Sequence, residues 1–143
     1  MAPTLLLLTL ALSPADAATP PPEAAVEDAS ELQGEWEIET YHFGRNNFLR
    51  MCLGDGWVFA GTSARLVDSM HGGVFKPFRV RVDPARFPAE IDEEMGDGRR
   101  IPGIYRRTGD ELIWAVAQTG NARPSSFERT SGVGLWTLRR VKK

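Results

Sequence analysis

The stretch Gly34-Glu35-Trp36-Glu37-Ile38-Glu39-Thr40 decides the fold of this 143-residue chain. Apolar Trp36 and Ile38 alternate with three glutamates, which is the two-residue period of a strand with one buried and one wet face. The three glutamates share the wet face, so we interpret them as solvated charges rather than as paired catalytic carboxylates. The same alternation continues to the end of the chain, and the stretch therefore opens an all-β domain.

Eight or nine short strands are expected in total, and no helical periodicity is long enough to bury a face. Turn signals such as Gly54-Asp55-Gly56 and Thr108-Gly109-Asp110 separate the strands. Strands joined by tight turns form an antiparallel meander, and closing it into a lipocalin-like barrel removes the exposed edges. A two-layer β-sandwich remains the alternative. The expected strands cover residues 35–40, 48–53, 57–60, 64–67, 74–82, 89–93, 100–107, 112–118 and 135–141.

The first 30 residues differ in character from the rest of the chain. Residues 5–12 form an apolar run, and residues 15–17 (Ala-Asp-Ala) give a small-x-small cleavage pattern, which together predict a signal peptide over residues 1–17. A permanent membrane helix needs about 20 apolar residues, so no membrane insertion of the mature chain is expected. Residues 18–30 are rich in Pro, Ala and acids and predict a disordered linker. The β domain then covers residues 31–143 of a periplasmic or extracellular protein.

Charge and cysteine content exclude several classes of protein. The formal net charge of -2 is too small to predict binding to nucleic acid or to a membrane surface. Cys52 is the only cysteine, so the domain has no internal disulfide and its stability must come from the core. Because Cys52 lies in an apolar run, we expect an inert buried thiol.

The titratable residues predict no catalytic or metal site, and no cofactor is expected. A zinc site needs three or four ligands, whereas His42 and His71 are isolated in the sequence, so we interpret both as solvated or hydrogen-bonded. The densest acidic cluster lacks the alternating spacing of a calcium loop, and we interpret it as charges flanking the Asp97-Gly98 turn. This cluster consists of Asp92, Glu93, Glu94 and Asp97.

Short motifs follow one another along residues 31–142: Leu32-Gln33-Gly34-Glu35-Trp36, Val82-Asp83-Pro84, Gly103-Ile104-Tyr105, Gly109-Asp110-Glu111-Leu112, Arg123-Pro124 and Leu138-Arg139-Arg140. Taken together in this order, they resemble a bacterial domain family that is abundant in planctomycetes. Members of that family commonly begin with a signal peptide. The family is regarded as lipocalin-like, and its biochemical function is not established. Residues 41–75 depart from the family pattern.

The resemblance implies a structural role for Gly34 and Trp36. In lipocalins, a Gly-x-Trp on the first strand closes one end of the barrel, and an arginine from the last strand crosses the indole. The glycine permits close approach of the chain, and the cation–π contact contributes about 0.5–2 kcal/mol. Arg139 or Arg140 supplies the cation, and counting in steps of two from Leu138 favours Arg140.

Aromatic residues inside such a barrel allow two interpretations. Trp57, Trp114 and Trp136 are candidates for lining a ligand pocket, but they can equally fill the interior. We predict an exported, non-enzymatic module that binds a small apolar ligand opposite the Trp36 floor, under loops that include residues 119–131. The alternative is a structural or protein-interaction domain of the cell envelope with a filled barrel, and an envelope enzyme is the third hypothesis. Ligand, partner and oligomeric state stay open.

Overall fold

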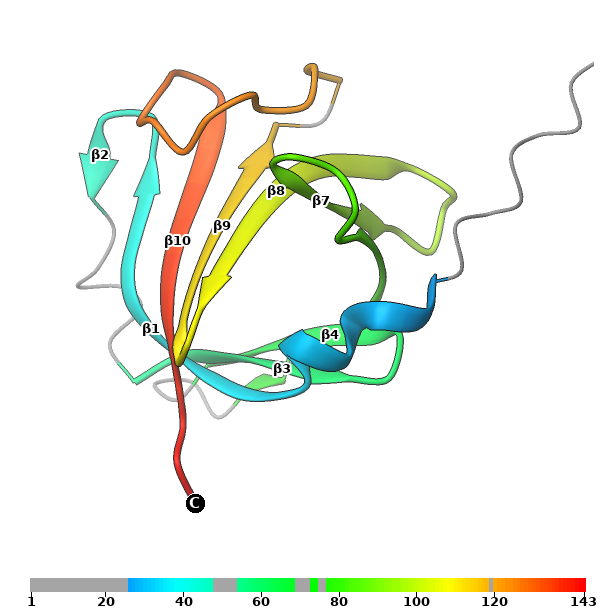
Figure 1. The fold of residues 1–143 in the computed structure, drawn as a ribbon. Coiled ribbons are helices and arrows are strands. Elements are labelled where there is room, and N and C mark those ends of the chain that lie inside the picture. Colours follow the sequence, from blue (N-terminus) through cyan, green and yellow to red (C-terminus); the bar gives the residue numbers. More distant parts are fainter. Residues whose placement is uncertain (1–25, 48–53, 69–72, 75–76, 119) are drawn as a thin grey trace, which may run out of the picture.

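The computed structural model of the protein describes residues 26–47, 54–68, 73–74, 77–118 and 120–143 (Figure 1). The predicted signal peptide, the predicted strand over residues 48–53, Cys52 and His71 lie outside the described residues.

Eight strands form a closed antiparallel barrel, and each strand pairs with the next one around it (Figure 1). β10 pairs with β1, and this pairing closes the sheet and excludes the β-sandwich. The all-β barrel expected from the sequence is therefore confirmed. The barrel strands are β1 (Gly34–Phe43), β3 (Gly56–Ala60), β4 (Ser63–Asp68), β6 (Phe78–Asp83), β7 (Ala89–Glu94), β8 (Arg100–Thr108), β9 (Glu111–Ala117) and β10 (Val133–Arg140).

Two further strands lie beside the barrel. β2 (Asn46–Asn47) pairs with β1, and β5 (Gly73–Val74) pairs with β4. The sequence predicted one strand over residues 74–82, whereas the structure has β5 and then β6, which begins at Phe78. Pro77 immediately precedes β6, and proline has no N–H to donate to a strand ladder.

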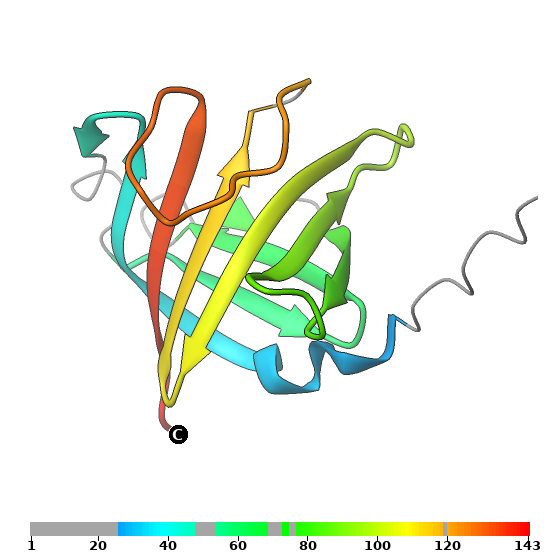
Figure 2. The same cartoon turned by 45° about the horizontal axis from the view of Figure 1, so that its top comes forward.

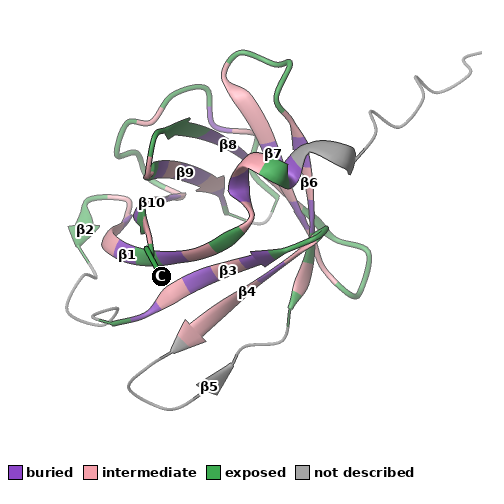
Figure 3. Cartoon of the chain, turned by 60° about the horizontal axis from the view of Figure 1, so that its bottom comes forward, coloured by how far each residue is buried: buried purple, intermediate pink, exposed green. Residues whose placement is uncertain are grey.

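The barrel has a floor, where β1 begins and β10 ends, and a mouth at the opposite end. Buried residues alternate with more exposed ones along the strands (Figure 3). Most of them form one core cluster inside the barrel, and Ile104, Ala115 and Leu135 form a smaller second cluster. The larger members of the core cluster are Leu32, Trp36, Ile38, Trp57, Phe59, Val80, Val82, Ile91, Tyr105, Leu112, Trp114 and Leu138.

A 3-10 helix, η1 (Val26–Leu32), covers the floor (Figure 3). Its Leu32 is completely buried and its Ala29 is 4% exposed, and both belong to the core cluster. The sequence predicted a disordered linker through residue 30, which is wrong for residues 26–30. The linker prediction followed from composition alone, whereas Ala29 and Leu32 of η1 are buried against the end of the barrel.

The Arg140 side chain fixes the floor. Its guanidinium carbon lies 4.2 Å from the centroid of the Trp36 ring. The same guanidinium donates hydrogen bonds to the carbonyl oxygens of Gln33 (2.5 Å) and Glu31 (2.9 Å). The Trp36 Nε1 donates to the carbonyl oxygen of Leu32 at 2.8 Å. One arginine and one tryptophan thus bind the end of η1 to the first and last strands.

Gly34 and Arg139 complete this region. Gly34 has a φ of +111°, and a Cβ at this position would lie 3.3 Å from the Arg140 Nη1, so glycine suits both the backbone and the close approach of the guanidinium. Arg139 faces outward and forms an ion pair with Glu39 of β1. Of the two arginines considered from the sequence, Arg140 is the one over the ring.

Replacing Arg140 with alanine should lower the free energy of unfolding by about 2–3 kcal/mol, because two charge-assisted hydrogen bonds and a cation–π contact are lost. The control Arg139→Ala removes only an exposed ion pair and should leave the free energy of unfolding nearly unchanged. Urea unfolding followed by tryptophan fluorescence measures both changes. Equal losses in the two variants would contradict the role of Arg140.

Candidate ligand site at the barrel mouth

A cavity of about 300 Å³ opens at the mouth of the barrel. Its walls are largely aromatic: the rings of Tyr41 and Trp136 stack with centroids 3.7 Å apart, and Trp57 meets Trp136 edge-on at 5.6 Å. The cavity is at the lower end of the size range of ligand pockets, about 300–1,000 Å³. The other described residues that line it are Phe43, Leu66, Glu93, Val116, Ala117, Gln118 and Gly134.

An irregularity in β1 brings Tyr41 into this cavity. Ile38 pairs with Leu138 of β10, but Thr40 pairs with the residue just before Leu138, so β1 contains one extra residue. An extra residue shifts the alternation of the strand by one. Tyr41 consequently faces inward opposite Trp136. Strict alternation from Trp36 and Ile38 would have placed it on the outer face.

Glu93 is the only acidic or basic residue among the described residues that line the cavity. It lies on β7 between two apolar neighbours, Val80 of β6 and Ile101 of β8. The residue is 8% exposed, and within the described part of the chain its carboxyl has no hydrogen bond or ion pair. Burial raises the pKa of this carboxyl to about 7, because removing the charged form from water is unfavourable.

The adjacent Glu94 has the opposite environment on the outer wall. Arg81 Nε donates to its carboxylate at 2.9 Å, and this bond together with the nearby charges of Arg79 and Arg100 lowers the pKa of Glu94. These arginines belong to β6 and β8, the strands on either side of β7. Their side chains lie on the outer wall, so they neutralise Glu94 and leave Glu93 unbalanced.

The acidic cluster predicted around the Asp97-Gly98 turn is therefore divided by the structure. Asp97 flanks the turn and Asp92 forms an ion pair on the outer wall, as surface charges do. The prediction was wrong for Glu93, which points into the barrel. Counting in steps of two from the apolar Ile91 places Glu93 on the inner face, so the sequence did contain the signal.

Two indole N–H groups near the mouth have no hydrogen-bond partner among the described residues, those of Trp57 and Trp114. Trp57 lines the cavity, whereas Trp114 is completely buried and packs against Trp57 with ring centroids 5.0 Å apart. Of the three tryptophans considered from the sequence, Trp57 and Trp136 therefore line the cavity and Trp114 lies in the core. The interior is packed toward the floor and open at the mouth.

His42 does not contribute to this site. It is not solvated, as it is 4% exposed, and its Nδ1 has no hydrogen-bond partner in the described part of the chain. Burial, and next the positive charge of Arg129, lower the pKa of its imidazole. Across the described residues, no group of three or more His, Cys, Asp or Glu side chains is placed to hold a metal ion.

The loop that follows β9 lies against the outer wall (Figure 2). Its Arg123 forms an ion pair with Asp92 of β7 and donates to the carbonyl oxygen of Gly103 of β8 at 2.9 Å. Its Phe127 packs on an apolar cluster outside the barrel. The prediction that residues 119–131 cover the mouth is therefore wrong for residues 123–127, because the side chains of Arg123 and Phe127 find partners on the outer wall.

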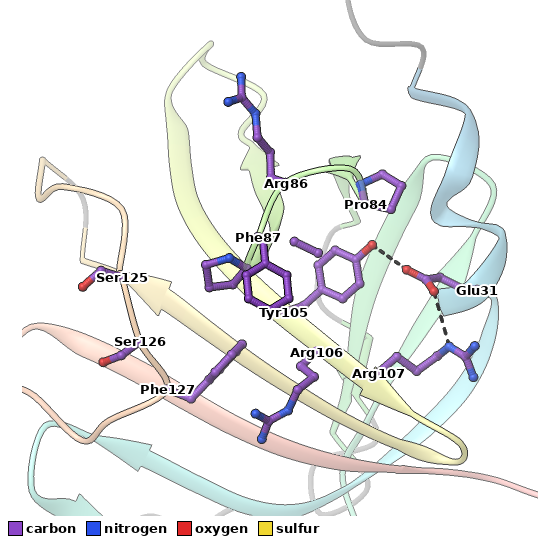
Figure 4. A pocket seen from close by; sticks show the side chains of 12 residues that line it. Glu31, Pro84, Arg86, Phe87, Tyr105, Arg106, Arg107, Ser125, Ser126 and Phe127 are labelled. Atoms are coloured by element: carbon purple, nitrogen blue, oxygen red, sulfur yellow. Dashed lines mark hydrogen bonds and ion pairs between the residues drawn. The ribbon is translucent and has the colours of Figure 1, made fainter.

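A second cavity, of about 480 Å³, lies outside the barrel between η1, the β6–β7 turn, β8 and the loop after β9 (Figure 4). Its carboxylate is already paired: Glu31 accepts a hydrogen bond from the Tyr105 hydroxyl at 2.5 Å and forms an ion pair with Arg107 at 3.5 Å. Phe87 at its edge is fully exposed. Because Glu31 is balanced and Glu93 is not, the mouth is the better candidate for a ligand site.

Glu93 should make the stability of the fold depend on pH. The pKa of an unperturbed glutamate is 4.5 and that of Glu93 in the fold is about 7, so between these values the unfolded chain binds fewer protons. The free energy of unfolding then falls as the pH rises, by about 3 kcal/mol for a shift of this size. Glu93→Gln removes the titrating group, so its stability relative to the unmodified protein should increase by about that amount over this range.

Urea unfolding of both proteins at several pH values between about 4.5 and 8 measures this difference. Glu94→Gln is the matched control, because it changes the adjacent carboxylate on the outer wall and leaves Glu93 in place. A constant offset between Glu93→Gln and the unmodified protein across the range would contradict the buried, unpaired state of Glu93.

A comparison with protein-family models, curated proteins and solved structures found no match to this chain. The resemblance to the planctomycete family therefore stays a hypothesis. The chemistry of the residues at the mouth is the basis on which a function can be assigned.

Proposed function

We propose that the protein is an exported, non-enzymatic, lipocalin-like module that binds one small molecule at the mouth of its barrel. The observation that carries the proposal is the carboxyl of Glu93, which is buried in a cavity walled by Trp57 and Trp136 and has no partner among the described residues. Burying a carboxyl without a partner opposes folding. Groups of this kind are typical of functional sites, where a ligand completes their interactions.

The composition of the walls supports contact with an apolar part of the ligand. The stacked rings of Tyr41 and Trp136 line the cavity together with the aliphatic side chains of Leu66 and Val116. Mostly apolar walls with a few polar groups are usual for small-molecule sites. The volume of about 300 Å³ favours a compact ligand. These properties agree with the small apolar ligand expected from the sequence and add one polar requirement, at Glu93.

The export part of the proposal rests on the signal peptide predicted over residues 1–17. In the described residues, no helix is long and apolar enough to cross a membrane. A structural or protein-interaction domain of the cell envelope is the second candidate. The packed interior around Trp114 and the exposed Phe87 favour it.

The mature protein should begin at Ala18, because signal peptidase cleaves after the small residues of the Ala15-Asp16-Ala17 pattern. N-terminal sequencing of the protein recovered from the exported fraction of its own host measures this. Ala17→Leu should block processing, whereas Ala18→Leu, next to the cleaved bond, is the control and should still be processed. An unprocessed N-terminus in the unmodified protein would overturn the export proposal.

Native mass spectrometry of the mature protein from its own host should show one bound small molecule. Val116→Phe should abolish this binding, because the added ring fills a cavity wall. Val58→Phe, the control, places the same ring on the outer face of β3 and should leave binding intact. A barrel that is consistently empty, with no thermal shift across a panel of lipids and metabolites, would overturn ligand binding and favour the second candidate.

A further inference from the structure

The rings and the carboxyl at the mouth share one electrostatic preference. The faces of aromatic rings carry negative potential and attract cations, tryptophan most strongly. Trp57, Trp136 and Tyr41 line the cavity that also contains Glu93. An ionised carboxyl attracts the same kind of group. Each of these four side chains therefore favours a positive charge in the cavity.

The described part of the chain supplies no such charge. On the strands beside β7, Arg79, Arg81 and Arg100 lie on the outer wall and act on Glu94. The described residues that line the cavity from the other strands are apolar or neutral, and the only titratable one among them is the Tyr41 phenol. Among the described residues, burial is the only cause that raises the pKa of Glu93, and none of them supplies a charge that compensates it.

Two other ligand classes fit these observations less well. A metal ion needs several N, O or S ligands, and no group of three or more His, Cys, Asp or Glu is placed for one in the described residues. An anion would meet an acidic group and the negative faces of the rings. A neutral ligand could contact the rings and accept a hydrogen bond from protonated Glu93. It would not supply the positive charge that the described residues of the cavity lack.

We propose that the mouth cavity binds a compact organic cation, a protonated amine or a quaternary ammonium group, whose charge pairs with Glu93 and whose apolar shell contacts Trp57 and Trp136. This inference rests on the proposed function, small-molecule binding at the mouth, and names the chemical class of the ligand. Aromatic walls around one carboxylate satisfy both parts of such a ligand, since the alkyl groups need apolar contact and the charge needs a counter-ion.

The proposal predicts that affinity rises with pH. Glu93 in the empty cavity has a pKa of about 7, and the cation pairs with its ionised form. The apparent affinity is proportional to the fraction of protein in the binding-competent form, which increases about tenfold between about pH 6 and about pH 8. A neutral ligand that accepts a hydrogen bond from protonated Glu93 would show the opposite dependence.

Titration with choline and with its neutral carbon isostere, 3,3-dimethylbutan-1-ol, tests the charge requirement directly. The two probes have nearly the same shape, and the fluorescence of Trp57 and Trp136 reports occupancy of the cavity. Choline should bind at least about tenfold more tightly than the isostere above pH 7. Glu93→Gln should remove both this preference and the rise of affinity with pH, whereas Glu94→Gln should retain both.

Equal affinity for the two probes, or affinity for choline that falls as the pH rises, would overturn the cation proposal and leave the proposed function intact. If neither probe binds, the molecule recovered with the host protein decides: an organic cation supports the proposal and a neutral or anionic molecule overturns it. A barrel that is empty in the host protein and binds neither probe would overturn the proposed function as well.

Discussion

The contact between Arg140 and Trp36 fixes the floor of the barrel at the point where the last strand pairs with the first. These two residues are directly paired between β10 and β1, so the contact joins the last strand to the first. The same guanidinium holds the carbonyl oxygens of Glu31 and Gln33, which fixes the end of η1 across the floor. With Leu32 buried beneath it, that end is filled by side chains, and the cavity lies at the opposite end.

The single extra residue in β1 determines what the cavity is made of. Without it, Thr40 and His42 would follow Trp36 and Ile38 on the inner face. With it, Tyr41 faces inward and stacks on Trp136. The packed floor keeps regular alternation, and the irregularity begins only beyond Ile38. One local change in register thus separates a stretch of strand that fills the core from a stretch that lines a site.

Alternation predicted most of the strands because burying one face of a sheet requires a two-residue period. It could not predict the extra residue in β1, which leaves no mark in composition. Nor could it place the loop after β9, whose position depends on Arg123 reaching Asp92, 31 residues away. Glu93 differs from both, because its position follows from Ile91 by simple counting. That prediction failed because the acidic character of the segment was given more weight than its period.

Glu93 suits ligand binding at the mouth better than it suits the stability of the fold. Its neighbours on β6 and β8, Val80 and Ile101, are apolar, so an apolar residue at position 93 would extend the core without opposing folding. The outer wall balances Glu94 with arginines, whereas the residues of the inner wall that the structure describes supply no charge to balance Glu93. The carboxyl therefore has no structural role that an apolar residue would not fill better. A cation that pairs with it would bind the folded state and not the unfolded chain, and so would stabilise the fold by mass action. Stability and binding at the mouth are thus two measurements of the same uncompensated charge.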